Sequence, residues 1–458
     1  MERIRRLWQQ EQPYEAVNGS AIDEEEERGQ DEGRRSQSFS WVDYLIFGLL
    51  GVAMLWAWNM LLAAGPYFQR RFEANPWISD NFQAAELSVS TITNLVSMVV
   101  LSKMQANASY PKRIVFALIL NTVAFTLLAL STVTFRNASA EAYFGFVVFI
   151  VFATSLATSF CQNGVFAFVS GFGNGSYTQG IMTGQGIAGV LPCIAQIVSV
   201  LSVTRKPPPS DHPSHPPPKP GPPPVPGKAA FAYFLTASVI SVLTLVAFFY
   251  LLRKQQITKS KRSRDDLTTS VDSLLAKERK SVPLSVLFRK LRWLAGGVFV
   301  TFVVTMTFPV FTQRILSVRD PLSSSPIFHP PSFIPLAFLF WNTGDLLGRL
   351  LPALPYLSLT SRPRIVFFLA VARVIFIPLY QLCNIRGQGA VVHSDAFYLV
   401  AVQLLFGISN GYVGSICMMG AAEWVNPDER EAAGGFMSLC LVAGLAVGSL
   451  ASFFVARG

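Results

Sequence analysis

Three polar residues interrupt an otherwise apolar run in the last third of the chain. Asn342, Asp345 and Arg349 follow Phe338 in the segment FLFWNTGDLLGR. In a helix, which turns by about 100° per residue, these four side chains share one narrow face. Asp345 lies four residues before Arg349, the favourable order for an ion pair along a helix. Both side chains of this pair keep unused hydrogen-bonding positions, which suit a ribose diol. The diol can accept from the Arg349 guanidinium and donate to the Asp345 carboxylate. A purely structural salt bridge is the alternative.

An aromatic and polar stripe lies in the first apolar run. Leu55, Trp58 and Asn59 share a helical face with Leu62, and Trp58 is too deep in the run to be an interfacial belt residue. An indole wall beside an amide suits a flat heteroaromatic ring. The alternative is ordinary helix packing, with Asn59 as a hydrogen bond between helices.

A glutamine stands on a third polar face, which Ser155, Thr158 and Gln162 form together. A glutamine side chain both donates and accepts, which matches the hydrogen-bonding edge of a purine or a pyrimidine. A hydrogen bond between packed helices remains the other reading of Gln162.

Phe308 lies at a predicted bend. Pro309, which follows it, lacks an N–H and frees a backbone carbonyl one turn earlier, so the sequence predicts a bent helix here. Phe308 either stacks on a ligand or packs within the bundle.

The composition indicates which elements carry these residues. Of 458 residues, 51% are apolar and only 14% are charged, which is too little charge for the surface of a soluble protein. The apolar residues form runs of about 20, the length that crosses the hydrocarbon core, and such runs must be helical. The sequence therefore predicts an all-α polytopic membrane protein with eleven spans, at about 41–64, 82–102, 114–134, 142–168, 175–202, 229–252, 293–312, 332–352, 364–383, 395–420 and 432–455.

The loops divide these spans into two bundles of six and five helices. We expect a cytoplasmic tail over residues 1–40, a first bundle over 41–252, a basic cytoplasmic loop over 253–292 and a second bundle over 293–458. A proline-rich segment, 206–226, is expected to be an extended polyproline spacer on the non-cytoplasmic side. Lys and Arg gather on the side of the N-terminus, which places it in the cytoplasm and the C-terminus in the lumen or outside the cell.

Several function classes are disfavoured. The basic residues flank the spans, so the net charge of +10 is a topology signal rather than a nucleic-acid surface. The five cysteines and four histidines form no metal-ligand spacing, and there is no phosphate-binding loop of the ATPase type. The sequence therefore predicts no enzyme activity, no metal and no cofactor; it names no protein partner.

The same segments, taken in order, resemble the equilibrative nucleoside transporter family. The resemblance rests on Leu55-x-x-Trp58-Asn59, Gln162, Gly184-Gln185-Gly186, Asn342-x-x-Asp345-x-x-Gly348-Arg349, Ala372-Arg373-x-x-Phe376-x-Pro378 and Ser409-Asn410-Gly411-Tyr412. One departure is Ala57, where the family has a proline before the first-helix tryptophan.

The resemblance implies a major-facilitator-like fold that works by alternating access. It also implies that Trp58, Gln162, Asp345 and Arg349 contact a nucleoside such as adenosine or uridine, with Gln162 near the base and the ion pair near the ribose. We expect facilitative transport of nucleosides, and of nucleobases as a further substrate class. The loops are of a fungal type, which favours a vacuolar or other endomembrane location over the plasma membrane. A sugar or drug carrier and a non-transporting receptor or scaffold remain as alternatives.

Overall fold

The computed structural model describes residues 39–105, 108–204, 227–265, 282–320 and 323–457. These residues form helices joined by turns, and the strand-like pairing among them is one bridge between Ile315 and Ile385. The chain from Asp43 onward is one compact unit, and of the segment before it only residues 39–42 are described. The predicted N-terminal tail, the proline-rich loop and the middle of the basic loop lie outside the described residues.

The first group of helices runs from α3 to α9. Asn75 caps α5, because its side chain accepts a hydrogen bond from the backbone N–H of Ile78 at 3.3 Å. Pro76 takes the first helical position, where its missing N–H costs nothing. The bounds are α3 (Trp41–Ala63), α4 (Gly65–Arg71), α5 (Pro76–Lys103), α6 (Tyr110–Thr134), α7 (Ala140–Ser170), α8 (Gly175–Thr204) and α9 (Gly227–Asp265).

The second group runs from α10 to α16. Its helices are more often interrupted: Met306 separates α10 from α11, a 3-10 turn over Arg373–Ile375 joins α13 to α14, and a π-helical segment over Phe397–Leu404 leads into α15. The bounds are α10 (Leu284–Thr305), α11 (Thr307–Thr312), α12 (Pro330–Leu350), α13 (Pro363–Ala372), α14 (Phe376–Gln381), α15 (Leu405–Gly420) and α16 (Arg430–Arg457).

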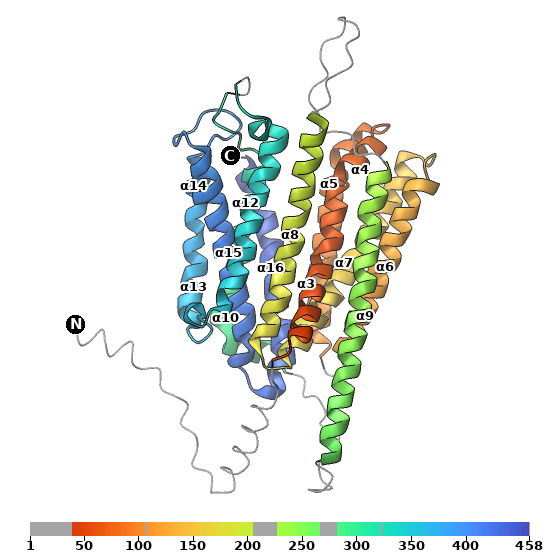
Figure 1. Ribbon diagram of the computed structural model, residues 1–458, viewed down its shortest axis with the longest axis vertical. Helices are drawn as coiled ribbons and strands as arrows, with labels where there is room; N and C mark the ends of the chain where they lie inside the picture. Colours follow the sequence, from red (N-terminus) through yellow and green to blue (C-terminus); the bar gives the residue numbers. More distant parts are fainter. Residues whose placement is uncertain (1–38, 106–107, 205–226, 266–281, 321–322, 458) are drawn as a thin grey trace, which may run out of the picture. The chain divides into compact units, whose positions relative to one another are not determined.

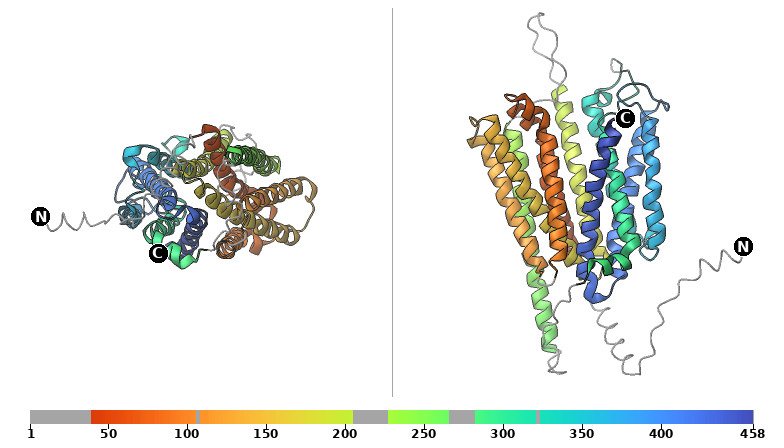
Figure 2. Two further views of the ribbon diagram at one scale, coloured as in Figure 1. Left: turned by 90° about the horizontal axis from the view of Figure 1, so that it is seen from below. Right: turned by 180° about the vertical axis from the view of Figure 1, so that it is seen from behind.

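Most helices pack on others of their own group, and α8 and α16 also pack extensively on the other group. In the first, α6 packs on α7 and α9; in the second, α12 packs on α15 and α10 on α16. Between the groups, α8 packs on α12, and α16 packs on α5 and α7. Figure 1 shows α8 and α12 side by side, and the view from behind in Figure 2 shows α16 beside α5. The fold is that of a membrane bundle in two groups of helices.

The structure supports the predicted span number. Ten described helical segments are long and apolar enough to cross a membrane. α12 is not one of them, because its polar residues lower its hydropathy, but it lies beside α8 and α15 along the bundle. In Figure 1, α3 begins at the lower end of the bundle and α16 ends at the upper end, so the number of crossings is odd. With α12 as the eleventh, the count agrees with the predicted eleven.

Glycines bring α12 and α15 into backbone contact. A Cβ at Gly344 would collide with the Leu404 carbonyl, at the end of the π-helical segment that leads into α15, and one at Gly348 with the Ile408 carbonyl of α15. A Cβ at Gly407 or Gly411 would collide with backbone carbonyls of α12. Small residues permit such close approach between helices in a membrane, where van der Waals packing drives association. This reciprocal contact fixes the height of Asp345 on α12 relative to α15.

Glycines also bring α8 and α16 close to neighbouring helices. A Cβ at Gly184 of α8 would collide with the backbone of Gly48 on α3, and one at Gly444 of α16 would collide with that of Phe299 on α10. These contacts fasten α8 within the first group and α16 within the second.

Candidate functional site

The predicted ion pair on α12 forms and is buried. Nε of Arg349 donates to Oδ2 of Asp345 at 2.7 Å, and the two residues are 5% and 4% exposed. Nδ2 of Asn410 on α15 donates to Oδ1 of Asp345 at 2.7 Å. Nη1 of Arg349 donates to the Met182 carbonyl oxygen at 2.9 Å and to Oε1 of Gln185 at 3.0 Å, both on α8. Among the described residues, Nη2 of Arg349 has no hydrogen-bond partner, so the pair keeps a donor for a ligand.

Asn410 connects this pair to a second buried arginine. Its Oδ1 accepts from Nη2 of Arg373 at 3.0 Å and from Oγ1 of Thr305 at 2.5 Å. Arg373 also donates through Nη1 to the Thr301 carbonyl oxygen at 2.6 Å and through Nε to Oγ of Ser409 at 3.1 Å. The sequence named no partner for Arg373, because these acceptors all come from other spans.

The charges of this cluster do not balance. Arg349 and Arg373 are cationic, and the one carboxylate of the cluster among the described residues is Asp345, which bonds to Arg349 directly and is linked to Arg373 through Asn410. A buried cation needs acceptors for its N–H groups, since unpaired polar groups are costly at low dielectric. Hydroxyl and carbonyl oxygens meet that need without adding a charge to be desolvated. Protein oxygens thus take up most of these N–H groups, and the remaining donor of Arg349 can bind an oxygen acceptor of a ligand.

Gln162 on α7 is an unengaged amide. It is 8% exposed, and its side chain has no hydrogen-bond partner in the described part of the chain. Its neighbours on the same face are engaged: Oγ of Ser155 donates to Oγ of Ser90 at 3.0 Å, and Oγ1 of Thr158 donates to the Thr154 carbonyl oxygen at 2.9 Å. Of the three predicted polar residues, Gln162 is the one left able to bind a ligand.

The three predicted site residues of α3 differ in what they contact. Nδ2 of Asn59 donates to the Ala188 carbonyl oxygen at 2.7 Å, so the amide joins α3 to α8. This bond favours the alternative reading, in which Asn59 serves helix packing. Leu55 and Trp58 are half-buried, and Trp58 packs against the apolar cluster around Phe68 and Phe234.

Phe308 lies in an aromatic stack. Its ring is 4.1 Å from that of Trp341 at an interplanar angle of 12°, and 5.0 Å from that of Phe338. Nε1 of Trp341 is buried without a hydrogen-bond partner among the described residues. The helix is interrupted at Met306, between α10 and α11, close to the bend predicted from Pro309. In this structure Phe308 packs on α12.

Asn342 lies on α12 one turn before the ion pair. Its Nδ2 donates to the Phe338 carbonyl oxygen at 2.9 Å and approaches Sγ of Cys193 on α8 at 3.5 Å. A Cβ on Gly189 would collide with Oδ1 of Asn342. Asn342 therefore faces α8, as does the ion pair.

The structure brings some of the predicted residues together and leaves others apart. Asn342, Asp345 and Arg349 line the α12 face against α8, and Phe308 reaches the same helix through its ring contacts. Among the described residues, no hydrogen bond or ring contact joins Gln162, Leu55 or Trp58 to that group.

Two residues of the cluster, Gln185 and Asn410, lie within the motifs that carry the family resemblance, but the sequence assigned neither of them to the site. Each is an isolated amide in an apolar run beside a glycine, and that pattern is the signal by which both could have been found.

Membrane-length helices in two groups, with a buried charged cluster where α8 meets α12, define an integral multi-pass membrane protein of the carrier class. Solved structures agree on the fold. The chain is similar to the major facilitator transporter FucP in its outward conformation (TM-score 0.53, 14% identity, 91% of both chains). It is also similar to the human organic anion transporter MFSD10 (TM-score 0.54, 14% identity, 91% of this chain and 94% of that one). The fold is therefore of the major-facilitator type.

Sequence comparison defines the family. The family profile described as "Nucleoside transporter" matches residues 144–457. The nucleoside transporter FUN26 of Saccharomyces cerevisiae is 28% identical, over 90% of this chain and 83% of the relative. The human equilibrative nucleoside transporter 1 is 26% identical, over 90% of this chain and 96% of the relative. The chain belongs to the nucleoside transporter family.

Proposed function

We propose that this chain is a facilitative transporter that moves nucleosides across a membrane by alternating access. The observation that carries the proposal is the buried Asp345–Arg349 pair, which retains a free donor group and lies where α12 of one helix group meets α8 of the other. Family membership and the relatives named as nucleoside transporters support the substrate class. A central site shared by two bundles is the arrangement that alternating access uses.

In this proposal the ion-pair cluster binds the sugar. A ribose hydroxyl oxygen accepts from Nη2 of Arg349, and its proton is directed to the Asp345 carboxylate. The Asp345 side chain accepts hydrogen bonds from Arg349 and Asn410, which suits a carrier that exchanges hydroxyl hydrogen bonds with its ligand.

We assign base recognition to Gln162 and to aromatic surfaces. The unengaged Gln162 amide supplies one donor and one acceptor for the base edge. We propose that Trp58, Leu55 and Phe308 supply apolar surface against which the ring of the base packs. Asn342 completes the proposed lining and is held in place by its bond to the Phe338 carbonyl oxygen. We assign Asn59, which is bonded to the Ala188 carbonyl oxygen, to helix packing.

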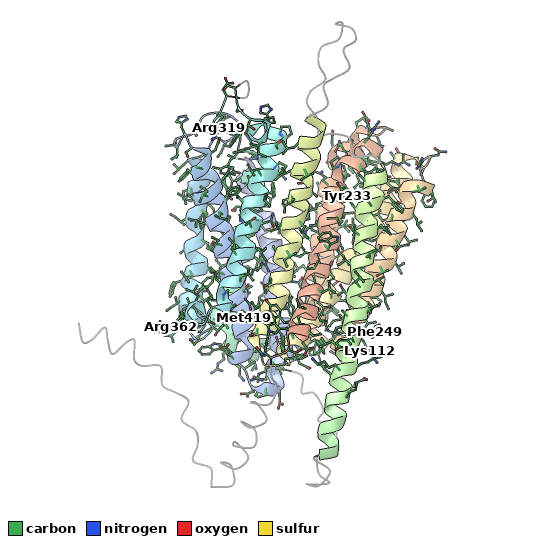
Figure 3. The ribbon with its side chains drawn as sticks, viewed as in Figure 1. Lys112, Tyr233, Phe249, Arg319, Arg362 and Met419 are labelled. Carbon is green, nitrogen blue, oxygen red and sulfur yellow. The ribbon has the colours of Figure 1, made fainter. Side chains whose placement is uncertain are left out.

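The proposed orientation places the lower end of the bundle in Figure 1 in the cytoplasm. Lys112 and Arg362 are labelled at that end in Figure 3, and Arg319 is labelled at the opposite end. The concentration of basic residues beside the lower ends of the helices supports this orientation. A vacuolar or other endomembrane location is proposed from the fungal type of the loops and the similarity to FUN26.

The test is counterflow of radiolabelled adenosine and uridine in proteoliposomes. The purified wild type should show saturable exchange, and Arg349→Ala should reduce it at least tenfold, because a charged hydrogen bond is worth about 1.5–3 kcal/mol. Uracil and adenine, tested as competitors, report whether free nucleobases share the site.

The matched control is Arg362→Ala, which removes an exposed arginine at the lower end of the same helix group. It should transport like the wild type. Folded wild type that exchanges neither nucleoside rejects the proposal, and sugars would then be tested as substrates.

A further inference from the structure

Gln185 holds the substrate-binding arginine from the opposite helix group. Its Oε1 accepts from Nη1 of Arg349 at 3.0 Å, and the same nitrogen donates to the Met182 carbonyl oxygen at 2.9 Å. The two hydrogens of Nη1 are thus both used by α8, while Nε is used by Asp345 on α12. A single guanidinium therefore bonds to both sides of the contact between α8 and α12.

The backbones around this contact are close together. A Cβ on Gly186 would press on Leu346 and on Cδ of Arg349, and a Cβ on Gly189 would collide with Asn342. We call the contact of residues 179–189 with residues 342–350 the α8–α12 seam. Water has little room in such a seam, so the hydrogen bonds that Arg349 makes there have no ready substitute from solvent.

The Gln185 amide has little else to bind. Among the described residues its Nε2 approaches only Sδ of Met54, at 3.9 Å, which is a weak acceptor. Gln185 is 6% exposed, and the α8–α12 seam keeps it against Arg349. Its strongest interaction is thus the one with the guanidinium.

We propose that Gln185 is a positioning residue and a latch, which ties Arg349 to α8 while the carrier is empty and is released when a ligand with sugar hydroxyls binds. Opening the α8–α12 seam in the empty carrier would leave two N–H donors of a buried cation unpaired, which is costly. When the sugar diol binds, one hydroxyl oxygen accepts from Nη2 and the other takes the place of the α8 acceptors at Nη1, so the loaded carrier opens the seam at a lower cost. The inference rests on the proposed function.

The latch has a kinetic consequence. Net flux requires the empty carrier to return, whereas exchange uses only loaded carriers. The wild type should therefore exchange uridine faster than it moves uridine into an empty compartment. Uridine placed on the far side of the membrane should therefore accelerate the entry of radiolabelled uridine. A nucleoside without the sugar diol, such as 2′,3′-dideoxyuridine, should accelerate that entry much less.

The experiment compares exchange with net flux of radiolabelled uridine in proteoliposomes. Gln185→Ala removes the acceptor, so the empty carrier returns faster and the exchange-to-net ratio should fall by about threefold to tenfold. Gln185→Glu adds an ion pair with Arg349 and should raise the ratio. The opposite directions of the two variants separate a latch from a loss of folding.

The matched control is Gln179→Ala. Gln179 is another amide of α8 that contacts α12, but it donates to the backbone carbonyls of Arg349 and Leu350, at 3.3 and 3.4 Å, rather than binding the guanidinium. Its removal should leave the ratio at the wild-type value. An unchanged ratio in both Gln185 variants, with active wild type, overturns the latch alone. A wild type that transports no nucleoside overturns the proposed function and the latch with it.

Discussion

The side-chain amide of Asn410 donates to Asp345 at 2.7 Å and accepts from Arg373 at 3.0 Å through its other end. It therefore orients a carboxylate on α12 and a guanidinium next to α13 from a single position on α15. A side chain that satisfies two buried charges at once has no simple substitute, because both would lose a partner together.

We expect Asn410→Leu to reduce uridine counterflow at least tenfold. The variant leaves Oδ1 of Asp345 and one donor of Arg373 unpaired in a buried site, which costs about 1–3 kcal/mol for each group. The thermal stability of the purified protein should fall as well. Ser409→Ala is the control, because Oγ of Ser409 takes a single bond from Arg373 at 3.1 Å and should have the smaller effect.

Gln162→Ala should change the preference among bases more than the recognition of ribose. The amide has no partner among the described residues, so its removal breaks no observed contact and should cost little stability. The measurement is competition by adenosine, guanosine, uridine and cytidine against uridine uptake. The same ranking in wild type and variant would mean that Gln162 only fills space in α7.

Asn59→Ala should lower stability without changing the apparent affinity for uridine. Its hydrogen bond to the Ala188 carbonyl oxygen joins α3 to α8, and bonds between helices in a membrane are worth about 0.6 kcal/mol on average. Thermal unfolding in detergent and the KM for uridine test the two parts separately. A raised KM with unchanged stability would place Asn59 at the ligand instead.

Glu86→Gln should be tolerated and should remove a dependence on pH. Glu86 is 4% exposed on α5, and its Oε1 has no hydrogen-bond partner among the described residues. A charged carboxylate buried without a hydrogen bond is costly, whereas glutamine has nearly the same shape and no charge. Raising the pH favours the charged form, so wild-type counterflow should fall at alkaline pH and that of the variant should not.

The control is Glu141→Gln, which neutralises an exposed acid at the start of α7. That variant should keep the alkaline decline of the wild type. Identical pH profiles for wild type and Glu86→Gln would show that the charge of Glu86 has no influence on the transport cycle.

Local patterns in the sequence were sufficient for part of this structure. The hydropathy pattern predicts the spans. In lipid the backbone N–H and C=O groups of each apolar run must bond to one another, and a helix achieves this within a single segment. Even α12, the least apolar span, was identified. The i,i+4 spacing gave the bond between Asp345 and Arg349, since both residues lie on one helix.

Local sequence patterns do not predict hydrogen bonds between spans that are far apart in the chain. Gln185 and Arg349 are 164 residues apart, and Asn410 and Asp345 are 65 apart. Such pairs depend on which helices are neighbours and at what height, which the glycine contacts of α12 and α15 determine only once the helices have packed. For Asn59 the sequence left binding and packing open, and only the position of Ala188 on α8 favours packing.

The described helices begin and end at opposite ends of the bundle. Because α3 begins at one end and α16 finishes at the other, we expect labels fused to the two termini to lie in different compartments. A fluorescent protein that is quenched by acid would report differently from each end of an acidic organelle. In sealed vesicles, a protease added outside would remove one tag and spare the other, and the tag that it spares identifies the orientation of the carrier.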